Sequence, residues 1–269
     1  IHDTTPQNRV MHPMKGPMTT QTLRGLKNPS NIPVGTPAEL FHWRGDRPTI
    51  QSFDVTYRDL MSGSIPTGAE MDALKDYLFS LQLHPNPNRG LNRAMPSNFN
   101  GANPNTGRLI VLDHLTSHCA ICHILPTGSD NNIDLSHIVG SSQPVKTVHL
   151  RTVYQRSNFS RNPGAINVSG FGLLKDGTGN ELAIAHFYDL QSFTTAQQFY
   201  DVAAFVQCFD TGIAPAVGYN LTVTVANRSL STVTTELTTL EAQAIANCNL
   251  VARGRVAGRV ARGVQPAPW

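Results

Sequence analysis

The pentapeptide CAICH occupies residues Cys119 to His123. Its two cysteines are three residues apart, about one turn of a helix, so both sulfurs can lie on one side of that turn. His123 follows directly and can bring an imidazole nitrogen to a metal from the same side. This is the attachment pattern of heme c, in which the cysteines bond to the porphyrin and the histidine binds the iron. The sequence therefore predicts heme c bound covalently at Cys119 and Cys122, with His123 as an axial ligand.

Two other interpretations of the cysteine pair, a disulfide and half of a zinc site, fit the rest of the chain less well. A zinc site needs a second pair, and the remaining cysteines, Cys208 and Cys248, are far apart in sequence. A redox-active pair would follow a strand in a thioredoxin-like βαβ unit, which the pattern lacks. Cys208 and Cys248 either bridge the last long helix to the C-terminal strands, or Cys208 is a buried thiol.

Helical periodicity frames the motif. Apolar residues recur at helical spacing, and Thr67 with Glu70 forms a capping box before one such segment. The predicted helices span 70–81, 107–116, 148–155, 196–209 and 237–246, and the predicted strands span 219–225 and 248–256. Gly and Pro are scattered between them. The predicted fold is mainly α, a cytochrome c-like helical heme domain with long ordered loops and a small C-terminal β/α extension.

Composition narrows the classes of partner. The chain has 269 residues, of which 40% are hydrophobic and 14% charged, enough apolar residues for a folded core. With 21 Lys and Arg against 18 Asp and Glu, the formal net charge of +3 is too weak to indicate nucleic-acid binding. No apolar run is long enough to span a membrane, and the first nine residues contain no signal-peptide core.

A faint internal repeat surrounds the motif. The string QTLRGL at 21–26 resembles VHLRTV at 148–153. Arg24 precedes Glu70, the start of the first predicted long helix, by the same interval at which Arg151 precedes Gln197, near the start of the last one. A charged glycine turn lies within each interval, HWRGDR at 42–47 and LLKDGT at 173–178. This order predicts two related units.

These strings, together with HPMKGPM at 12–18, SGFGLLKDG at 169–177 and DVAAFVQCFDTG at 201–212, resemble bacterial secreted cytochromes c of the di-heme peroxidase type. The resemblance covers about 10–217 and is greatest to cytochrome modules that often follow a β-propeller. Members carry two heme motifs, whereas this chain has one. A histidine placed before Arg24 as His123 is before Arg151 would precede Ile1. We therefore expect 1–95 to be the distal part of a first cytochrome c-like unit with its attachment motif upstream, 96–217 to be the heme c domain, and 218–269 to be a small β-containing extension with a basic tail.

The resemblance also implies further site residues. It places His42 as the axial ligand of a second heme, with His12 as the weaker alternative. Arg24 and Arg151 are candidates for pairing with heme propionates, because a guanidinium can make two parallel bonds to a carboxylate. The sixth ligand of the heme at His123 is open, since Leu173 and Leu174 stand where the family has a ligand. His149 is the best candidate, either as ligand or as a histidine beside a propionate. The others are His137, His186 and Lys175.

The predicted function is electron transfer through heme c in the bacterial periplasm or outside the cell, within a multi-heme assembly. Its partners would be redox proteins or neighbouring heme subunits. One alternative is a di-heme peroxidase-like enzyme that reduces hydrogen peroxide at an open iron site, for which an acid-base residue beside the heme is needed. Glu181 is the nearest acid after the second glycine turn. Another alternative is a heme-stabilised structural module of a surface assembly.

Overall fold

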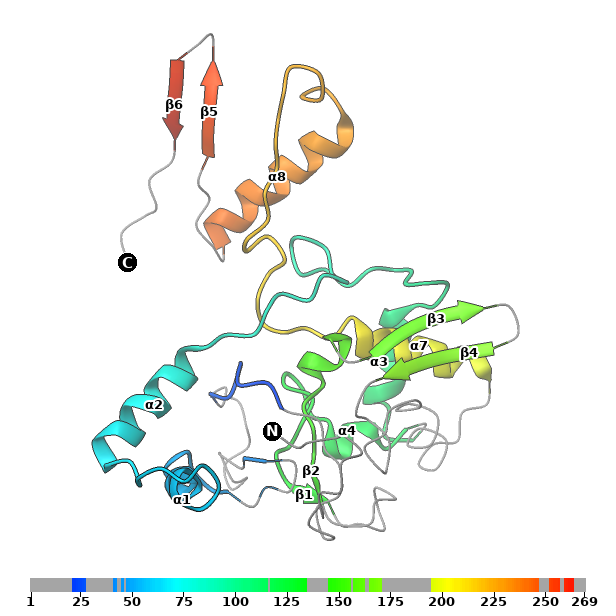
Figure 1. Ribbon diagram of the computed structural model, residues 1–269. Coiled ribbons are helices and arrows are strands. Elements are labelled where there is room, and N and C mark those ends of the chain that lie inside the picture. Colours follow the sequence, from blue (N-terminus) through cyan, green and yellow to red (C-terminus); the bar gives the residue numbers. More distant parts are fainter. Residues whose placement is uncertain are drawn as a thin grey trace.

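The computed structural model describes residues 21–27, 41–42, 45, 47–115, 117–134, 145–155, 157–162, 165–170, 195–246, 252–256 and 259–263. This part of the chain is mainly helical, and its strands form antiparallel pairs rather than a larger sheet (Figure 1). The helices are α1 (Asp54–Asp59), α2 (Gly68–Ser80), α3 (Pro104–Leu112), α4 (Cys119–Cys122), α7 (Ala196–Gln207) and α8 (Ser231–Ala246), with 3₁₀ turns η1 (Gln51–Phe53) and η2 (Leu150–Gln155). The strand pairs are β1 (Ile133–Asp134) with β2 (Val145–Lys146), β3 (Ser157–Asn162) with β4 (Ala165–Gly170), and β5 (Ala252–Val256) with β6 (Arg259–Gly263).

The main core forms where α3 crosses α7. A Cβ atom added to Gly107 of α3 would lie 1.8 Å from the backbone oxygen of Asp201 in α7, so the two backbones touch at this glycine. The Asp201 carboxylate accepts a 2.8 Å hydrogen bond from the backbone N–H of Asn103, the N-cap of α3. Apolar side chains from α3, α7 and η2 fill the core around this crossing: Ile110, Val111, Leu150, Val153, Val202, Phe205, Val206 and Phe209.

Helix α7 is buried on most of its surface. The predicted apolar face, which includes Phe199, Val202 and Val206, is buried as expected. Thr195 and Gln198 form a capping box at its first turn, so the start of the predicted helix at 196 is confirmed. A helix that is apolar nearly all round is one that the surrounding chain encloses, and α7 is therefore the centre of the core.

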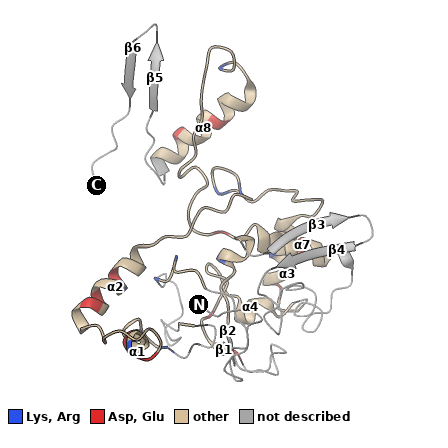
Figure 2. Cartoon of the chain, in the orientation of Figure 1, with Lys and Arg blue, Asp and Glu red and all other residues tan. Residues whose placement is uncertain are grey.

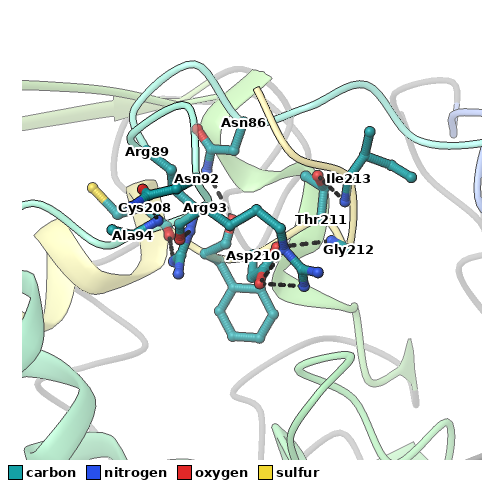
Figure 3. Close-up of polar contacts among 11 residues, drawn as sticks. Asn86, Arg89, Asn92, Arg93, Ala94, Cys208, Asp210, Thr211, Gly212 and Ile213 are labelled. Atoms are coloured by element: carbon teal, nitrogen blue, oxygen red, sulfur yellow. Dashed lines mark hydrogen bonds and ion pairs between the residues drawn. The ribbon is translucent and has the colours of Figure 1, made fainter. Parts of the chain in front are cut away.

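The C-terminal end of α7 is held by the segment that precedes α3 (Figure 3). The side-chain amide of Asn86, which is fully buried, donates 2.8 Å hydrogen bonds to the carbonyls of Gln207 and Phe209. Arg89 donates from Nη1 to the Cys208 carbonyl at 2.6 Å, and Arg93 pairs with Asp210 at 2.7 Å. Asn86 and Arg89 thus bind carbonyls at and just beyond the last turn of α7, where a helix leaves its carbonyls unpaired, and Arg93 binds a carboxylate close by.

A second, smaller core lies between α2 and the segment before α1. Phe41, Ile50, Met71 and Leu78 are buried there. The predicted capping box of α2 is confirmed, because Thr67 accepts from the Glu70 backbone while the Glu70 carboxylate accepts from Thr67.

Three predicted helices differ from the structure. Helix α3 begins at Pro104, earlier than expected, because Asn103 caps it and proline suits the first helical position. The predicted helix 148–155 is instead the 3₁₀ turn η2. Helix α8 begins at Ser231, ahead of the predicted 237.

The predicted strand 219–225 is wrong, and the predicted strand 248–256 is confirmed only over β5. Residues 219–224 carry no strand and lead into a turn. The Asn227 side chain accepts from the Thr224 backbone and donates to the Thr222 carbonyl, so it uses backbone groups that a strand ladder would need. Val225 is 81% exposed, so no described part of the chain covers its side chain.

Charges are sparse on the described part of the chain (Figure 2). Acidic positions lie on α2 and α8, and basic positions lie both on loops and on helices, for example Arg58 of α1 and Lys75 of α2. In these residues no helix is long and apolar enough to cross a membrane.

The crossing at Gly107 predicts a large loss of stability for Gly107→Ala. The added methyl group would overlap the α7 backbone, which cannot move as a side chain can, so we expect a cost of about 2 kcal/mol or more and a Tm lower by several degrees. Gly68→Ala is the matched control, because nothing lies within 4 Å of its added Cβ at the start of α2. Thermal unfolding checks both variants, and equal Tm values would show that the backbones do not touch.

Candidate functional site

The CAICH motif forms the single turn α4. The His123 backbone N–H donates to the Cys119 carbonyl at 2.8 Å and closes the turn. Both cysteines and the histidine therefore belong to this one turn. Cys119 packs against the main core. Cys119, Cys122 and Cys208, the cysteines within the described ranges, are all free thiols. The two motif cysteines are therefore available to bond to another group.

His123 is oriented by the loop that follows it. Its ring Nδ1 lies 2.7 Å from the Gly128 carbonyl oxygen. Because a carbonyl can only accept, Nδ1 carries the proton and the lone pair of the neutral ring is on Nε2. Burial lowers the pKa of His123, while the carbonyls of Gly128 and Val148 act in the opposite direction. A half-buried neutral imidazole held through its other nitrogen is the form in which histidine binds a metal.

Gly128 lies between the motif and η2 and contacts both. Its φ of +73° is a conformation that suits glycine, and an added Cβ would lie 2.7 Å from Cβ of Leu150. Its backbone N–H donates to Ile124 at 2.7 Å. The loop after the motif is thus pressed against the first residue of η2, and this contact brings Arg151 close to the histidine loop in the fold.

The strand pair β1–β2 supports the second cysteine. Cys122 Sγ donates to the Asp134 carboxylate at 3.5 Å, and Thr147 Oγ1 donates to the other oxygen of that carboxylate. Ser129 Oγ donates to the Thr147 carbonyl at 2.7 Å, which ties the histidine loop to the same pair.

The electrostatics around the cysteines keep them protonated. Burial, followed by the nearby Asp134 and Asp130, raises the pKa of Cys122 to about 12, and burial raises the pKa of Cys119. A thiolate is the form that attacks disulfides, so a redox-active cysteine pair is disfavoured here. Among the described residues, no group of three or more His, Cys, Asp or Glu side chains could hold a metal ion by itself.

The two repeat arginines differ in their surroundings. Arg151 is half-buried, and its Nη2 donates to the Gly25 carbonyl at 3.2 Å. Its Nε is buried and, within the part of the chain that is described, has no hydrogen-bond partner. Arg24 is exposed and donates from Nη1 to the Gln82 carbonyl at 3.2 Å. A buried guanidinium N–H that lacks an acceptor fits a carboxylate ligand such as a heme propionate, so Arg151 suits that role better than Arg24.

The predicted histidine ligands lie in different places. His149 is half-buried between Val148, whose carbonyl acts on His123, and the start of η2. His42 has a φ of +66°, and its ring contacts Phe53 edge-on at a centroid distance of 4.7 Å. His149 therefore adjoins the motif in the fold, whereas His42 belongs to the α1–α2 core.

Several predicted residues lie outside the described residues: His12, His137, Leu173, Leu174, Lys175, Glu181, His186 and Cys248. Cys208 is described, and it is the buried thiol of the two alternatives left open for it, with Sγ 3.6 Å from the Asn88 carbonyl.

The sequence analysis missed the residues that support the motif, namely Gly128, Asp134 and Thr147. A signal for the first existed in the string PTGSDNN, in which a glycine precedes turn-forming Ser, Asp and Asn residues. The pairing of Asp134 with Thr147 depends on the β1–β2 register and has no local signal.

No family model matches the chain, and neither the curated proteins nor the solved structures include one that is similar to it.

Lys146, which lies opposite Ile133 in the β1–β2 pair, gives the first test of this region. Burial lowers the pKa of Lys146 to about 8, below its value near 10.5 in the unfolded chain. At pH 7.5 both states are protonated and the folded state bears the cost of a buried charge. As pH rises from 8 to 10.5 the folded state loses its proton first, and stability should increase.

We therefore expect Lys146→Met to raise the free energy of unfolding at pH 7.5 by on the order of 1–3 kcal/mol. The difference in unfolding free energy between the variant and the wild type should become smaller towards pH 10.5. Denaturant unfolding at several pH values measures it. A variant that is less stable at pH 7.5, by an amount that does not change with pH, contradicts the assignment.

Proposed function

We propose that this chain is an extracytoplasmic c-type cytochrome of bacteria that carries electrons through heme c bonded to Cys119 and Cys122, with His123 as axial ligand. The observation that carries the proposal is the 2.7 Å contact of His123 Nδ1 with the Gly128 carbonyl, beside two free thiols one turn apart. That contact requires a proton on Nδ1, and burial, which lowers the pKa of His123, favours the neutral ring whose lone pair on Nε2 iron ligation from this turn requires.

The protonated thiols suit covalent attachment. Each S–H adds across one vinyl double bond of the porphyrin, so sulfur and hydrogen end on the two former vinyl carbons and nothing leaves. The bound heme would supply reversible one-electron chemistry of iron. The chain's own part is to hold the histidine ring, exclude water with the α3–α7–η2 core against which Cys119 and Leu125 pack, and set the charge around the group.

Other residues of the proposal follow from their surroundings. Arg151 would bind a heme propionate, which its buried Nε supports because no described residue accepts from it. His149, next to Val148, is the proposed neighbour of the same heme as ligand or propionate partner. His42 is the proposed ligand of a second heme whose cysteines are not in this sequence. Burial of the Phe41 ring in the α2 core holds the backbone next to His42 and supports this placement.

The proposed setting is the periplasm or the cell exterior, where heme c is attached in bacteria. Partners would be redox proteins or neighbouring heme subunits in a larger assembly, in keeping with the family resemblance of the motif strings. The sparse charge of the described residues supports contact-driven rather than strongly steered association.

Covalent heme is the first test. Mature protein made with cytochrome c maturation machinery should show the heme c band in an alkaline pyridine hemochrome spectrum and stain for heme on a denaturing gel. Cys122→Ala should lose one thioether bond and shift that band, and the double variant C119A/C122A should lose the stain. Cys208→Ala, the described cysteine outside the motif, should retain full heme. An unstained wild-type protein refutes the proposal.

An electron carrier and a peroxidase-like enzyme are expected to differ in the spectrum of the ferric heme and in the rate of hydrogen peroxide turnover. We expect a low-spin six-coordinate ferric heme that cyanide does not readily perturb, because a carrier keeps both axial positions filled. Steady-state turnover of hydrogen peroxide with a reduced donor should stay well below about 10 per second, the median for enzymes. A high-spin heme with turnover at or above that rate would instead establish the peroxidase-like alternative.

A further inference from the structure

The two arginine-bearing repeats meet in the fold. Arg151, from the repeat that follows the motif, donates from Nη2 to the carbonyl of Gly25, the neighbour of Arg24 in the other repeat. The two residues are separated by 126 positions in sequence, so this contact arises from tertiary structure. The loop 21–27 and the turn η2 therefore share one junction.

The loop side of this junction is fixed by its backbone. The Gly25 N–H donates to the Leu81 carbonyl at 2.8 Å, and Gly25 has a φ of +67°. A Cβ added there would lie 2.6 Å from Cγ of Leu83, a buried residue. On the η2 side, Tyr154 donates to the Pro85 carbonyl at 3.2 Å. With the backbone of the loop held in this way, the Gly25 carbonyl accepts from Arg151 at 3.2 Å.

Two N–H groups of Arg151 have different surroundings at this junction. Nη2 donates to the Gly25 carbonyl, while the buried Nε has no acceptor within the described part of the chain. It follows Leu150, which packs on the glycine whose carbonyl holds His123. A buried charged group with an unpaired N–H is costly, and a nearby carboxylate would remove that cost.

Resting on the proposed function, we infer that Arg151 is a positioning residue that couples the loop 21–27 to the redox equilibrium of the heme at His123. The Gly25 carbonyl holds one arm of the guanidinium, and Nε is thereby presented to a heme propionate. The conformation of the loop then sets how closely a positive charge approaches the iron. A cation held near the heme disfavours the ferric state, which carries one more positive charge than the ferrous state.

The test is the midpoint potential of the holoprotein. Arg151→Gln should shift the ferric–ferrous equilibrium at least tenfold towards ferric, which is about 59 mV for one electron. Arg151→Lys keeps the charge without the fork and should shift it less. Gly25→Ala should displace the loop and lower the potential in the wild-type background, but should have no effect on top of Arg151→Gln.

Two control variants separate this coupling from general effects. Arg108→Gln removes an exposed arginine of α3, and Gly218→Ala places alanine at a φ of +81° with nothing within 4 Å, so neither should move the potential.

If heme is attached and Arg151→Gln leaves the potential unchanged, the inference is overturned while the proposed function stands. A Gly25→Ala shift of equal size in both backgrounds also overturns it. If Arg151→Gln does not fold, the Arg151→Lys and Gly25→Ala cycle decides in the same way. A wild-type chain without covalent heme overturns both.

Discussion

The position of the CAICH motif depends on the contact between the α3 and α7 backbones at Gly107. Only glycine allows this approach, and the Asp201 carboxylate fixes the register by accepting from the backbone N–H of Asn103, the N-cap residue of α3. Beyond the C-terminal end of α3 the chain is held at Ser117. Ser117 is fully buried and donates to the Ile110 carbonyl at 2.7 Å, and its backbone N–H binds Asp113. Cys119 comes two residues later, so the helix crossing determines where the motif sits on the core.

The ends of α7 are bound by different means, and this difference explains which parts of the fold the sequence could predict. The first turn is capped by Thr195 and Gln198, a local signal that a reader of the sequence can see. The last turn is bound by Asn86 and Arg89, which lie more than a hundred residues earlier and have no local signal. Arg89 also brings a cation to the negative end of the helix dipole, and burial lowers the pKa of this arginine.

The same distinction holds at the site. The cysteine spacing and His123 are adjacent in sequence, and a local pattern was enough to predict them. Their supporting contacts were not predictable, because Asp134 reaches Cys122 only when β1 pairs with β2, and Gly128 is placed by Leu150. The strand predicted over 219–225 failed for a related reason. Alternating Val and Thr residues favour a strand, but a strand must pair its backbone groups with a second strand. Here the Asn227 side chain instead binds the Thr224 N–H and the Thr222 carbonyl.

The repeat arginines show what an internal repeat can and cannot specify. Similar strings, QTLRGL and VHLRTV, put the same side chain at matching positions, yet Arg24 is exposed and Arg151 is half-buried. The difference comes from their neighbours. Leu150, the residue before Arg151, packs on Gly128 and in the main core, whereas Arg24 precedes a glycine at a positive φ and lies exposed in the loop 21–27. The repeat therefore supplies two guanidinium groups, and the tertiary structure directs one of them towards the interior, where an unpaired N–H has chemical consequences.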